Sequence, residues 1–201
     1  YGGSVGYWNF YLAVPLNSGT NNTISLANGP YLDTCTFLVS TPFLGTPYVV
    51  PSQSGSSVTI EMENYDLGGE GQGFHKIATA PQSGYRSPDP VVVEGSSNAS
   101  NRYCIGYCDA GEWLNYTVSV LTSGTYNLNV YASTQYSNDT LVVEDGTVPF
   151  TSGTMTMPNT GGYYNFTAGP TTPIYLTSGT HVLKMYNKTG GYTLDYFTIG
   201  H

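Results

Sequence analysis

The sequence contains little charge, since only 9% of its 201 residues are Asp, Glu, Lys or Arg. Five basic residues stand against thirteen acidic ones, which gives a formal net charge of −8 at pH 7. Nucleic acids and anionic membrane surfaces are bound through clustered Lys and Arg, and the chain has too few for either. No apolar run is long enough to span a membrane. The composition therefore excludes nucleic-acid partners and predicts no membrane span.

Helix-favouring residues are scarce as well, because Glu, Lys, Arg and Gln are few and no segment repeats its apolar residues with a helical period. Thr, Ser and Asn are abundant instead, together with 25 Gly and 19 Tyr. This composition suits strands joined by tight turns. We therefore expect an all-β protein.

Cysteine is limited to three residues, Cys35, Cys104 and Cys108. In one extended strand Cys104 and Cys108 would lie roughly 13 Å apart, which is too far for a disulfide. Either Ile105-Gly106 forms a turn that joins them, or one of them pairs with Cys35, and one cysteine is left over in both cases. A zinc site is poorly supported, because no His or fourth thiol stands at ligand spacing.

Six Asn-x-Ser/Thr sequons indicate a secreted, extracellular glycoprotein, either free or part of a cell-surface appendage. The chain begins at Tyr1 and not at Met, so we expect that any signal peptide has been removed or left out. Three of the sequons, at Asn98, Asn138 and Asn187, stand in turn-like contexts that suit glycans. The candidate acceptors are Asn21, Asn98, Asn115, Asn138, Asn165 and Asn187.

Strands and turns alternate regularly from Val58 to the end of the chain. Along 113–120 every second residue is apolar, which predicts a half-buried strand whose other, polar face carries the Asn115 sequon. Segments 121–131 and 176–186 each combine a Ser-Gly turn with a strand, and a last strand spans 192–199. Strands in this number and spacing predict a β-sandwich of the jelly-roll type.

Residues 1–56 differ from the rest, because Asp33 is their one charged residue. A strongly β-prone run spans 5–14, shorter strand candidates follow at 34–40 and 48–51, and 51–57 resembles a flexible linker. So short a segment buries little of its own surface, and uncharged strands left open are an aggregation hazard.

We therefore expect 1–56 to be a strand-rich extension that pairs in trans with another copy of the chain, head to tail, and builds a filament. The alternative is that the same strand folds back onto its own domain. The residues expected to form this assembly strand are Tyr7, Trp8, Phe10, Leu12 and Val14.

Glu61 and Glu63 alternate with Ile60 and Met62 in a strand predicted over 58–63, so both carboxylates should leave one face about 7 Å apart. Three interpretations are open. The acids could form a glycosidase pair, since this separation falls near the range of those enzymes. They could be calcium ligands, since hard cations take closely spaced carboxylate oxygens. They could also be a solvated strand face.

Three stretches together resemble the family 6 carbohydrate-binding modules, over about 57–201. They are 60–71 (IEMENYDLGGEG), 107–116 (YCDAGEWLNY) and 190–197 (GGYTLDYF). The resemblance implies a lectin-like β-sandwich over 57–201 that binds polysaccharide or another glycan and holds a structural calcium ion. In the family the opening acids and the closing Asp hold the calcium. The matching residues here are Glu61, Glu63 and Asp195.

The same resemblance implies a sugar site at a loop edge, where aromatic rings stack on pyranose faces and a polar side chain bonds hydroxyls. The matching residues are Tyr107, Tyr163, Tyr192 and Thr193. Two of these tyrosines stand where Trp is common in the family, and Thr193 stands where Asn is common. Glu70, His75 and Arg86 fit the family's loop pattern, whereas Lys76 replaces an acid often found there.

Catalysis has little support, since no Ser-His-Asp order with an elbow motif occurs. His75, His181 and His201 have no partnering acid at motif spacing. We therefore expect a non-catalytic extracellular structural subunit that self-assembles through its N-terminal strand and binds glycans. The alternative is a free-standing or enzyme-appended polysaccharide-binding module that does not assemble.

Overall fold

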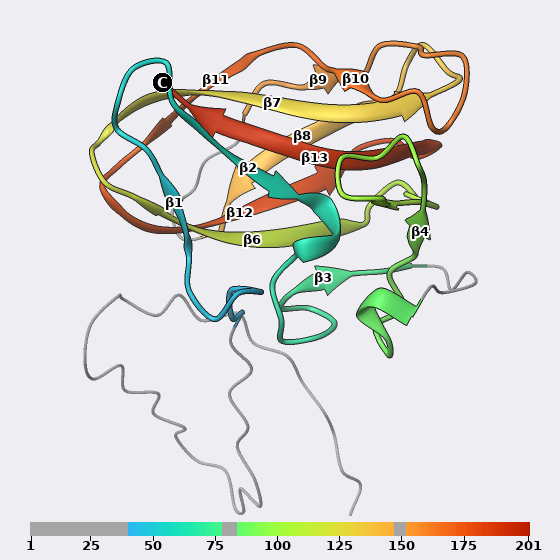
Figure 1. Cartoon of the computed structure of the whole chain (residues 1–201), viewed down its shortest axis with the longest axis horizontal. Helices are drawn as coiled ribbons and strands as arrows, with labels where there is room; N and C mark the ends of the chain where they lie inside the picture. The colour runs from blue at the N-terminus through green and yellow to red at the C-terminus, as the bar shows by residue number, and fades with distance from the viewer. Residues whose placement is uncertain (1–39, 78–83, 147–151) are drawn as a thin grey trace, which may run out of the picture. The chain divides into compact units, whose positions relative to one another are not determined.

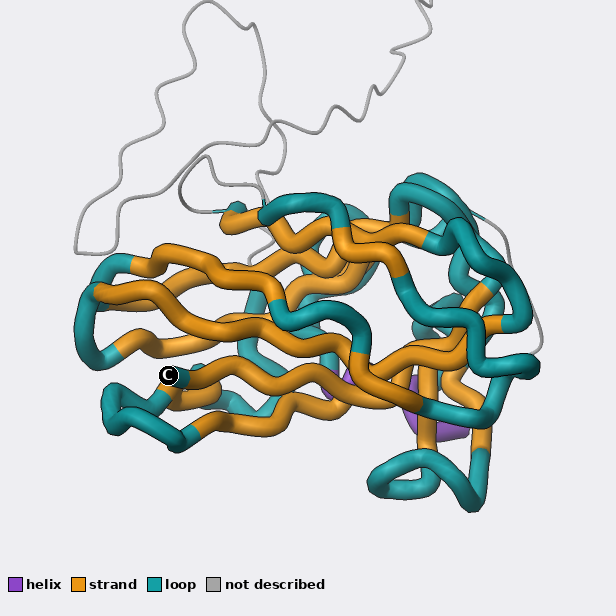
Figure 2. The backbone as a smooth tube through the Cα atoms, turned by 90° about the horizontal axis from the view of Figure 1, so that it is seen from above, coloured by secondary structure: helices purple, strands orange, loops and turns teal. Residues whose placement is uncertain are grey.

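Two β-sheets stacked face to face form the part of the chain that the computed structural model describes, residues 40–77, 84–146 and 152–201 (Figures 1 and 2). Their inward side chains meet in one hydrophobic core. Within these described ranges the helical elements are two short 3-10 turns, η1 (Met62–Asn64) and η2 (Gly84–Arg86). The predicted all-β sandwich is confirmed.

The first sheet has six strands in the order β1-β6-β12-β8-β9, with β3 beside β6. β6 and β12 are antiparallel and pair along almost their whole length, from Val120 opposite Gly179 to Trp113 opposite Tyr186. The strands are β1 (Tyr48–Val50), β3 (Phe74–His75), β6 (Trp113–Val120), β8 (Thr140–Asp145), β9 (Met155–Thr156) and β12 (Gly179–Asn187).

The second sheet has seven strands in the order β10-β7-β13-β5-β4, with β11 beside β7 and β2 beside β13. β2 and β13 are antiparallel, so that Ser57 lies opposite Gly200 and Glu61 opposite Tyr196. The strands are β2 (Ser57–Glu61), β4 (Val93–Gly95), β5 (Tyr103–Ile105), β7 (Gly124–Thr134), β10 (Thr167–Ala168), β11 (Thr172–Leu176) and β13 (Tyr192–Gly200).

The apolar alternation along β6 is confirmed, because every second residue from Leu114 to Val120 is buried in the core. Tyr116 packs edge-on against the Phe197 ring of the opposite sheet at 5.0 Å and donates its hydroxyl to the Met62 carbonyl at 2.7 Å. β7 and β12 begin at the two Ser-Gly turns, and β13 is the predicted last strand. The alternation of apolar and polar residues, together with the turn signals, therefore predicted the positions of β6, β7, β12 and β13 correctly.

The middle of the other face of β6, at Asn115 and Thr117, is buried, contrary to the sequence prediction, whereas Trp113 and Ser119 at its ends are partly exposed. The loop after η1 crosses it: Asp66 donates its N–H to the Asn115 carbonyl at 2.8 Å, and its carboxylate accepts the Thr117 N–H at 3.0 Å. The Asn115 side chain is buried and donates to the Gln72 carbonyl at 2.6 Å. A buried amide with this bond cannot carry a glycan in the folded chain, so Asn115 is excluded as an acceptor.

Asn187 is also excluded as a glycan acceptor, because it lies within β12 and not in a turn. Its side chain is buried and accepts the Tyr192 hydroxyl at 2.8 Å. Asn98, Asn138 and Asn165 are exposed, and Asn21 lies outside the described residues. Glycosylation at these exposed positions stays a prediction.

The strand predicted over 58–63 ends earlier, at Glu61, because the chain turns there into η1. Glu61 and Glu63 therefore do not leave one face of a strand. Glu61 is half-buried, whereas Glu63 in η1 is completely buried. The interpretation as a solvated strand face is wrong.

The domain boundary predicted after residue 56 is wrong as well. Tyr48–Val50 form β1, which pairs in parallel with β6 inside the sandwich. All described residues belong to one compact unit. Segment 51–57 connects β1 to β2 and is not an interdomain linker. The expected assembly strand, 5–14, lies outside the described residues, so pairing in trans stays a prediction.

Cys104 and Cys108 are both buried free thiols. Each S–H faces a backbone carbonyl, that of Glu94 at 3.7 Å and that of Ile105 at 3.9 Å. Burial raises the pKa of Cys104 to about 12 and also raises the pKa of Cys108, so both thiols are inert near neutral pH. The disulfide between them is not formed, and Cys35 lies outside the described residues.

Candidate functional site

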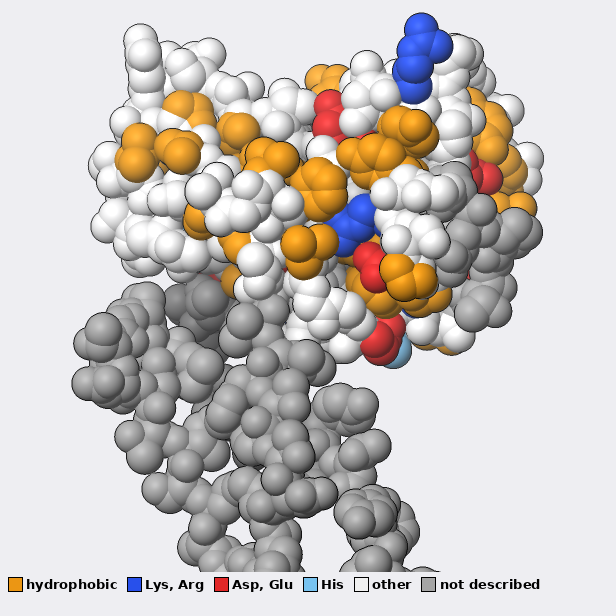
Figure 3. Space-filling model, turned by 60° about the horizontal axis from the view of Figure 1, so that its bottom comes forward, with side chains coloured by type: hydrophobic (Ala, Val, Ile, Leu, Met, Phe, Trp, Pro, Cys, Tyr) orange, Lys and Arg blue, Asp and Glu red, His pale blue; other side chains and the backbone are white. Residues whose placement is uncertain are grey.

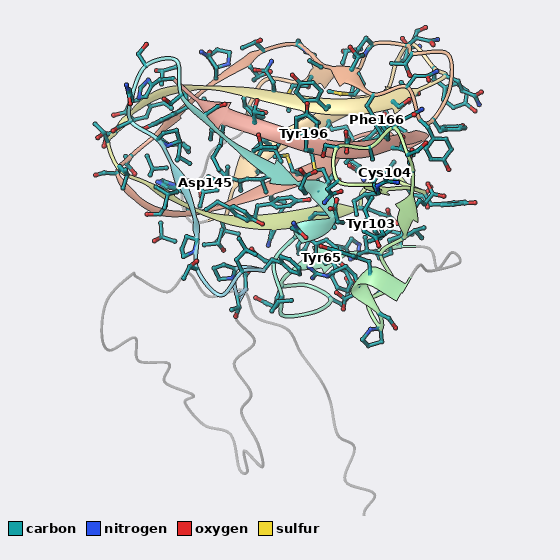
Figure 4. The ribbon with its side chains drawn as sticks, in the orientation of Figure 1. Tyr65, Tyr103, Cys104, Asp145, Phe166 and Tyr196 are labelled. Atoms are coloured by element: carbon teal, nitrogen blue, oxygen red, sulfur yellow. The ribbon has the colours of Figure 1, made fainter. Side chains whose placement is uncertain are left out.

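Loops gather at one end of the sandwich, where β6 and β13 begin and β7 and β12 end, on the right in Figure 1. Three tyrosines are exposed in these loops: Tyr107 by 58%, Tyr136 by 49% and Tyr164 by 42%. Figure 4 shows further aromatic side chains at this end, with Tyr103 and Phe166 labelled. Exposed aromatic rings are therefore concentrated at the loop end.

Glu94 connects two of these tyrosines. Its carboxylate lies over Gly106, where an added Cβ would come within 2.0 Å of Oε2, so a larger residue at 106 would displace the Glu94 carboxylate from this position. Burial and the charge of the neighbouring Glu94 carboxylate raise the pKa of Tyr164, and nearby Tyr107 adds to the shift. Tyr107, Tyr164 and Glu94 thus share one patch of surface, which we call the Tyr107 patch. Sequence reasoning identified only Tyr107 of the three.

A glycine pair leaves bare backbone between the Tyr107 loop and Tyr136. Gly191 donates its N–H to the Cys108 carbonyl at 3.0 Å, and a Cβ on Gly190 would lie 2.6 Å from that oxygen. A Cβ on Gly191 would lie 3.2 Å from the Tyr136 ring. The two glycines therefore place no side chain of their own between the Cys108 backbone and the Tyr136 ring.

Tyr163 lies beside Tyr136, as part of a hydrogen-bonded group. Gln135 donates its side-chain amide to the Tyr163 hydroxyl at 2.9 Å and to the Tyr136 hydroxyl at 3.0 Å. Tyr163 is half-buried and its neighbour Tyr164 is more exposed. Loop geometry decides which of two consecutive tyrosines faces solvent, and the sequence does not show it.

Tyr192 and Thr193 cannot contact a sugar, which corrects the prediction made for them. Tyr192 is 1% exposed because it begins β13 with its ring in the core. Thr193 is 3% exposed and donates its hydroxyl to the backbone carbonyl of Tyr163, under the loop that carries that residue. Of the four predicted sugar-site residues, Tyr107 and the half-buried Tyr163 remain accessible.

The predicted calcium ligands do lie close together, because β2 pairs with β13. Ser100 bridges two of them, donating its hydroxyl to Glu61 at 2.5 Å and its N–H to Asp195 at 3.0 Å. The Asn101 side chain donates to Glu63. Glu63 and Asp195 are both buried. We call these three carboxylates the acid cluster.

The donor chemistry of the acid cluster suits a hard cation. Burial, together with the smaller effect of the Glu61 charge, raises the pKa of Glu63 to about 7 and that of Asp195 to about 6. The buried Oε2 of Glu63 has no hydrogen-bond donor. Calcium takes such carboxylate oxygens. Among the described residues, however, no group of three His, Cys, Asp or Glu side chains is arranged to hold a metal ion as it stands, so calcium stays a prediction.

A second aromatic surface surrounds Trp113 on the outer face of the six-stranded sheet. The Lys184 ammonium lies 5.0 Å from the centre of the Trp113 ring and 3.9 Å from the Glu144 carboxylate, and the His75 ring lies 6.1 Å from the Trp113 ring. Sequence reasoning missed this surface as a site. The alternation along β6, which placed Trp113 on the outward face, was the signal for it.

Two histidines have acid partners that the sequence spacing did not reveal. His75 pairs with Glu70 in the exposed loop before β3. His181 in β12 bonds Asp145 in β8 at 2.5 Å, and its other ring nitrogen faces the Thr177 carbonyl at 2.8 Å. The second pair is buried away from the loop end, and we assign it to packing.

Together, the sandwich and the exposed rings at its loop end define a lectin-like binding module. The family model described as "Carbohydrate binding module (family 6)" matches residues 83–201. The chain therefore belongs to family 6 of the carbohydrate-binding modules, which are non-catalytic binding modules.

Solved structures share this fold. The C-terminal family 6 module of LamC, a marine laminarinase from Zobellia galactanivorans, is 21% identical with a TM-score of 0.56 and covers 73% of this chain and 100% of its own. A module of lichenase 5A from Cellvibrio mixtus, in complex with cellotriose, is 24% identical with a TM-score of 0.55 and covers 72% and 96%.

A β-1,3-glucan-binding family 6 module from Bacillus halodurans is 17% identical with a TM-score of 0.55, and covers 78% of this chain and 100% of its own. At these identities the likeness establishes the fold. A sequence comparison with curated proteins found no match. In the described part of the chain no helix has the length and apolarity to cross a membrane.

Proposed function

We propose that this chain binds a neutral glycan through the Tyr107 patch at its loop end. The observation that carries the proposal is the pair of exposed rings, Tyr107 and Tyr164, next to the Glu94 carboxylate. Flat aromatic faces stack on the C–H-bearing faces of sugar rings, and a carboxylate accepts hydrogen bonds from sugar hydroxyls. The three side chains supply both interactions within one patch.

A neutral glycan suits the charge of the module better than an acidic one. The chain has only five Lys and Arg against thirteen acids, and Glu94 would repel a uronate or sulfate group. Figure 3 shows a face on which uncharged polar and apolar groups dominate and charged side chains are few. The structural neighbours that bind cellotriose and β-1,3-glucan support a β-glucan as the first ligand to test.

The acid cluster would hold a calcium ion through Glu61, Glu63 and Asp195. When bound, the ion would offset the mutual repulsion of these carboxylates and join β2, which ends at Glu61, to β13, which carries Asp195. The orphaned oxygen of Glu63 and the shared Ser100 bridge support this role. In this proposal calcium stabilises the fold and does not touch the glycan.

A secreted, extracellular location is part of the same proposal. The exposed sequons at Asn98, Asn138 and Asn165 support it, because glycans are attached on the secretory route. The family match favours the plain binding module over the self-assembling subunit. Filament formation rests on residues 5–14 and remains a separate prediction.

Three single substitutions test the glycan site: Tyr107→Ala, Tyr164→Ala and the matched control Tyr175→Ala. Tyr175 in β11 is 58% exposed, the same as Tyr107, but lies outside the patch. Titration calorimetry with a soluble β-1,3-glucan and with cello-oligosaccharides should show at least about tenfold weaker binding for the first two, since loss of an aromatic anchor commonly costs about 1.4 kcal/mol or more.

The control should bind as the unaltered protein does. A fourth variant, Trp113→Ala, distinguishes the two aromatic surfaces. If only Trp113→Ala abolishes binding, the glycan occupies the outer sheet face and the proposed site is wrong. If every glycan tested fails to bind the unaltered protein, the proposed β-glucan ligand is wrong.

A further inference from the structure

Lys76 and Glu112 form a buried ion pair beneath the Tyr107 loop. Their side chains are each 5% exposed, and the Lys76 ammonium lies 2.6 Å from the Glu112 carboxylate. Lysine is almost never buried unless it is paired, and this chain has only five basic residues in all. A cation placed here must serve a specific local contact.

That contact is the backbone of Tyr107. The Lys76 ammonium also donates to the Tyr107 carbonyl, at 2.5 Å. The Glu112 carboxylate in turn accepts the Ile77 N–H at 3.0 Å and the Asp109 N–H at 3.1 Å. The pair therefore ties the segment after β3 to Tyr107 and Asp109 in the loop before β6.

Tyr107 needs such support because its backbone is in the left-handed region, with a φ of 51°. A side chain of this size rarely adopts that conformation without outside restraint. Gly106 and Cys108 on either side are buried, whereas the Tyr107 ring is the exposed part of the loop. The left-handed backbone and the exposed ring therefore occur at the same residue, between two buried neighbours.

We propose that the Lys76–Glu112 pair positions Tyr107 for the glycan. Tyr107 then already has its binding conformation in the free protein, and little conformational entropy is lost when the glycan binds. The inference rests on the proposed function, since it assumes that Tyr107 contacts the ligand. Rigid presentation of a contact residue improves affinity by lowering the entropy lost in the complex. Neither Lys76 nor Glu112 needs to touch the sugar.

The test compares Lys76→Met with the double variant K76M/E112Q. The single change leaves the Glu112 charge buried without its partner, so it should lower stability as well as affinity. The double variant is neutral at both positions and recovers stability, but it still lacks the donor to the Tyr107 carbonyl. Both should bind the β-glucan about tenfold more weakly by calorimetry.

His181→Gln is the control for stability loss alone. His181 and Asp145 form another buried pair, with side chains 4% and 2% exposed. Figure 4 shows Asp145 well away from Cys104, the strand residue that precedes the Tyr107 loop. This variant should melt at a lower temperature and bind with unchanged affinity.

A double variant that binds as tightly as the unaltered protein, while Tyr107→Ala does not bind, overturns the positioning role and leaves the proposed function intact. If Tyr107→Ala itself binds normally, the proposed site fails first. Backbone ¹⁵N relaxation of the unaltered protein decides the matter if the variants do not fold. Tyr107 should be as rigid as the strands, and a mobile Tyr107 would overturn the inference.

Discussion

Acidification should stabilise the metal-free module, in contrast to the usual loss of stability in acid. The perturbation is a change from pH 8 to pH 5 after calcium has been removed. Burial raises the pKa of Glu63 from 4.5 to about 7 in the folded chain, so between these values the folded state holds a proton that the unfolded state releases. Stability rises as pH falls wherever the native state binds more protons. The gain therefore begins near pH 7 and is complete below 4.5.

The magnitude follows from the two pKa values of Glu63. The difference between 4.5 and about 7, at 1.36 kcal/mol per pH unit, amounts to about 3 kcal/mol in the free energy of unfolding. Most of this stabilisation is already present at pH 5. Asp195, whose pKa burial raises to about 6, changes stability in the same direction. Because both acids respond to the Glu61 charge, their contributions do not simply add.

Urea denaturation of calcium-free protein at pH 5 and pH 8 measures the effect. Glu63→Gln should be more stable than the unaltered protein at pH 8 and should lose most of the pH dependence. Glu144→Gln, at a partly exposed carboxylate on the other sheet, should keep it. Added calcium should reverse the trend, because metal binding requires deprotonated acids. A metal-free protein that is equally or less stable at pH 5 refutes the reasoning.

Two further predictions concern the stability of the fold and the assembly of the chain. Arg86→Met should lower the free energy of unfolding, measured in urea, by about 3–5 kcal/mol, because the buried guanidinium donates to the Tyr65 carbonyl at 2.6 Å and contacts the Asp89 carboxylate at 3.3 Å. The control Arg102→Met, at an exposed position, should change this free energy little. Equal stability of the two variants would contradict the prediction. Deleting residues 1–16 should convert an assembled protein into a soluble monomer that still melts cooperatively, and a full-length chain that sediments as a monomer at high concentration would contradict assembly through this segment.

The long strands could be predicted because their patterns are local. β6 and β13 alternate or carry family-like motifs along their whole length, and both were located. β1 was assigned to the wrong domain because a strand of three residues has too little pattern of its own. Its place is decided by pairing with β6, some seventy positions later in the sequence. Short edge strands depend on such distant partners, and a single sequence does not show them.

The site was partly predictable for a similar reason. Tyr107 and the acid cluster lie in motifs that hold several residues at fixed spacing. Glu94 reaches the patch only because β4 pairs with β5 and sets its carboxylate over Gly106. Tyr192 follows the same Gly-Gly pair pattern as Tyr163, yet it starts a strand and turns inward. Motif spacing identified the loops, and loop geometry decided which rings face solvent.

The pairing of β2 with β13 has a mechanical consequence. Ser57 lies opposite Gly200, and the contact continues where the His201 N–H donates to the Ser56 carbonyl at 3.2 Å. A force that pulled these two neighbouring strand ends apart would load the hydrogen bonds one after another, as in a zipper, and not all at once as in shear. An ion held by Glu61 and Asp195 would sit at the far end of that zipper. Such an ion would stop the separation at the end of β2, before it reached η1, which would matter for a module that is anchored to a polymer while its own chain is under tension.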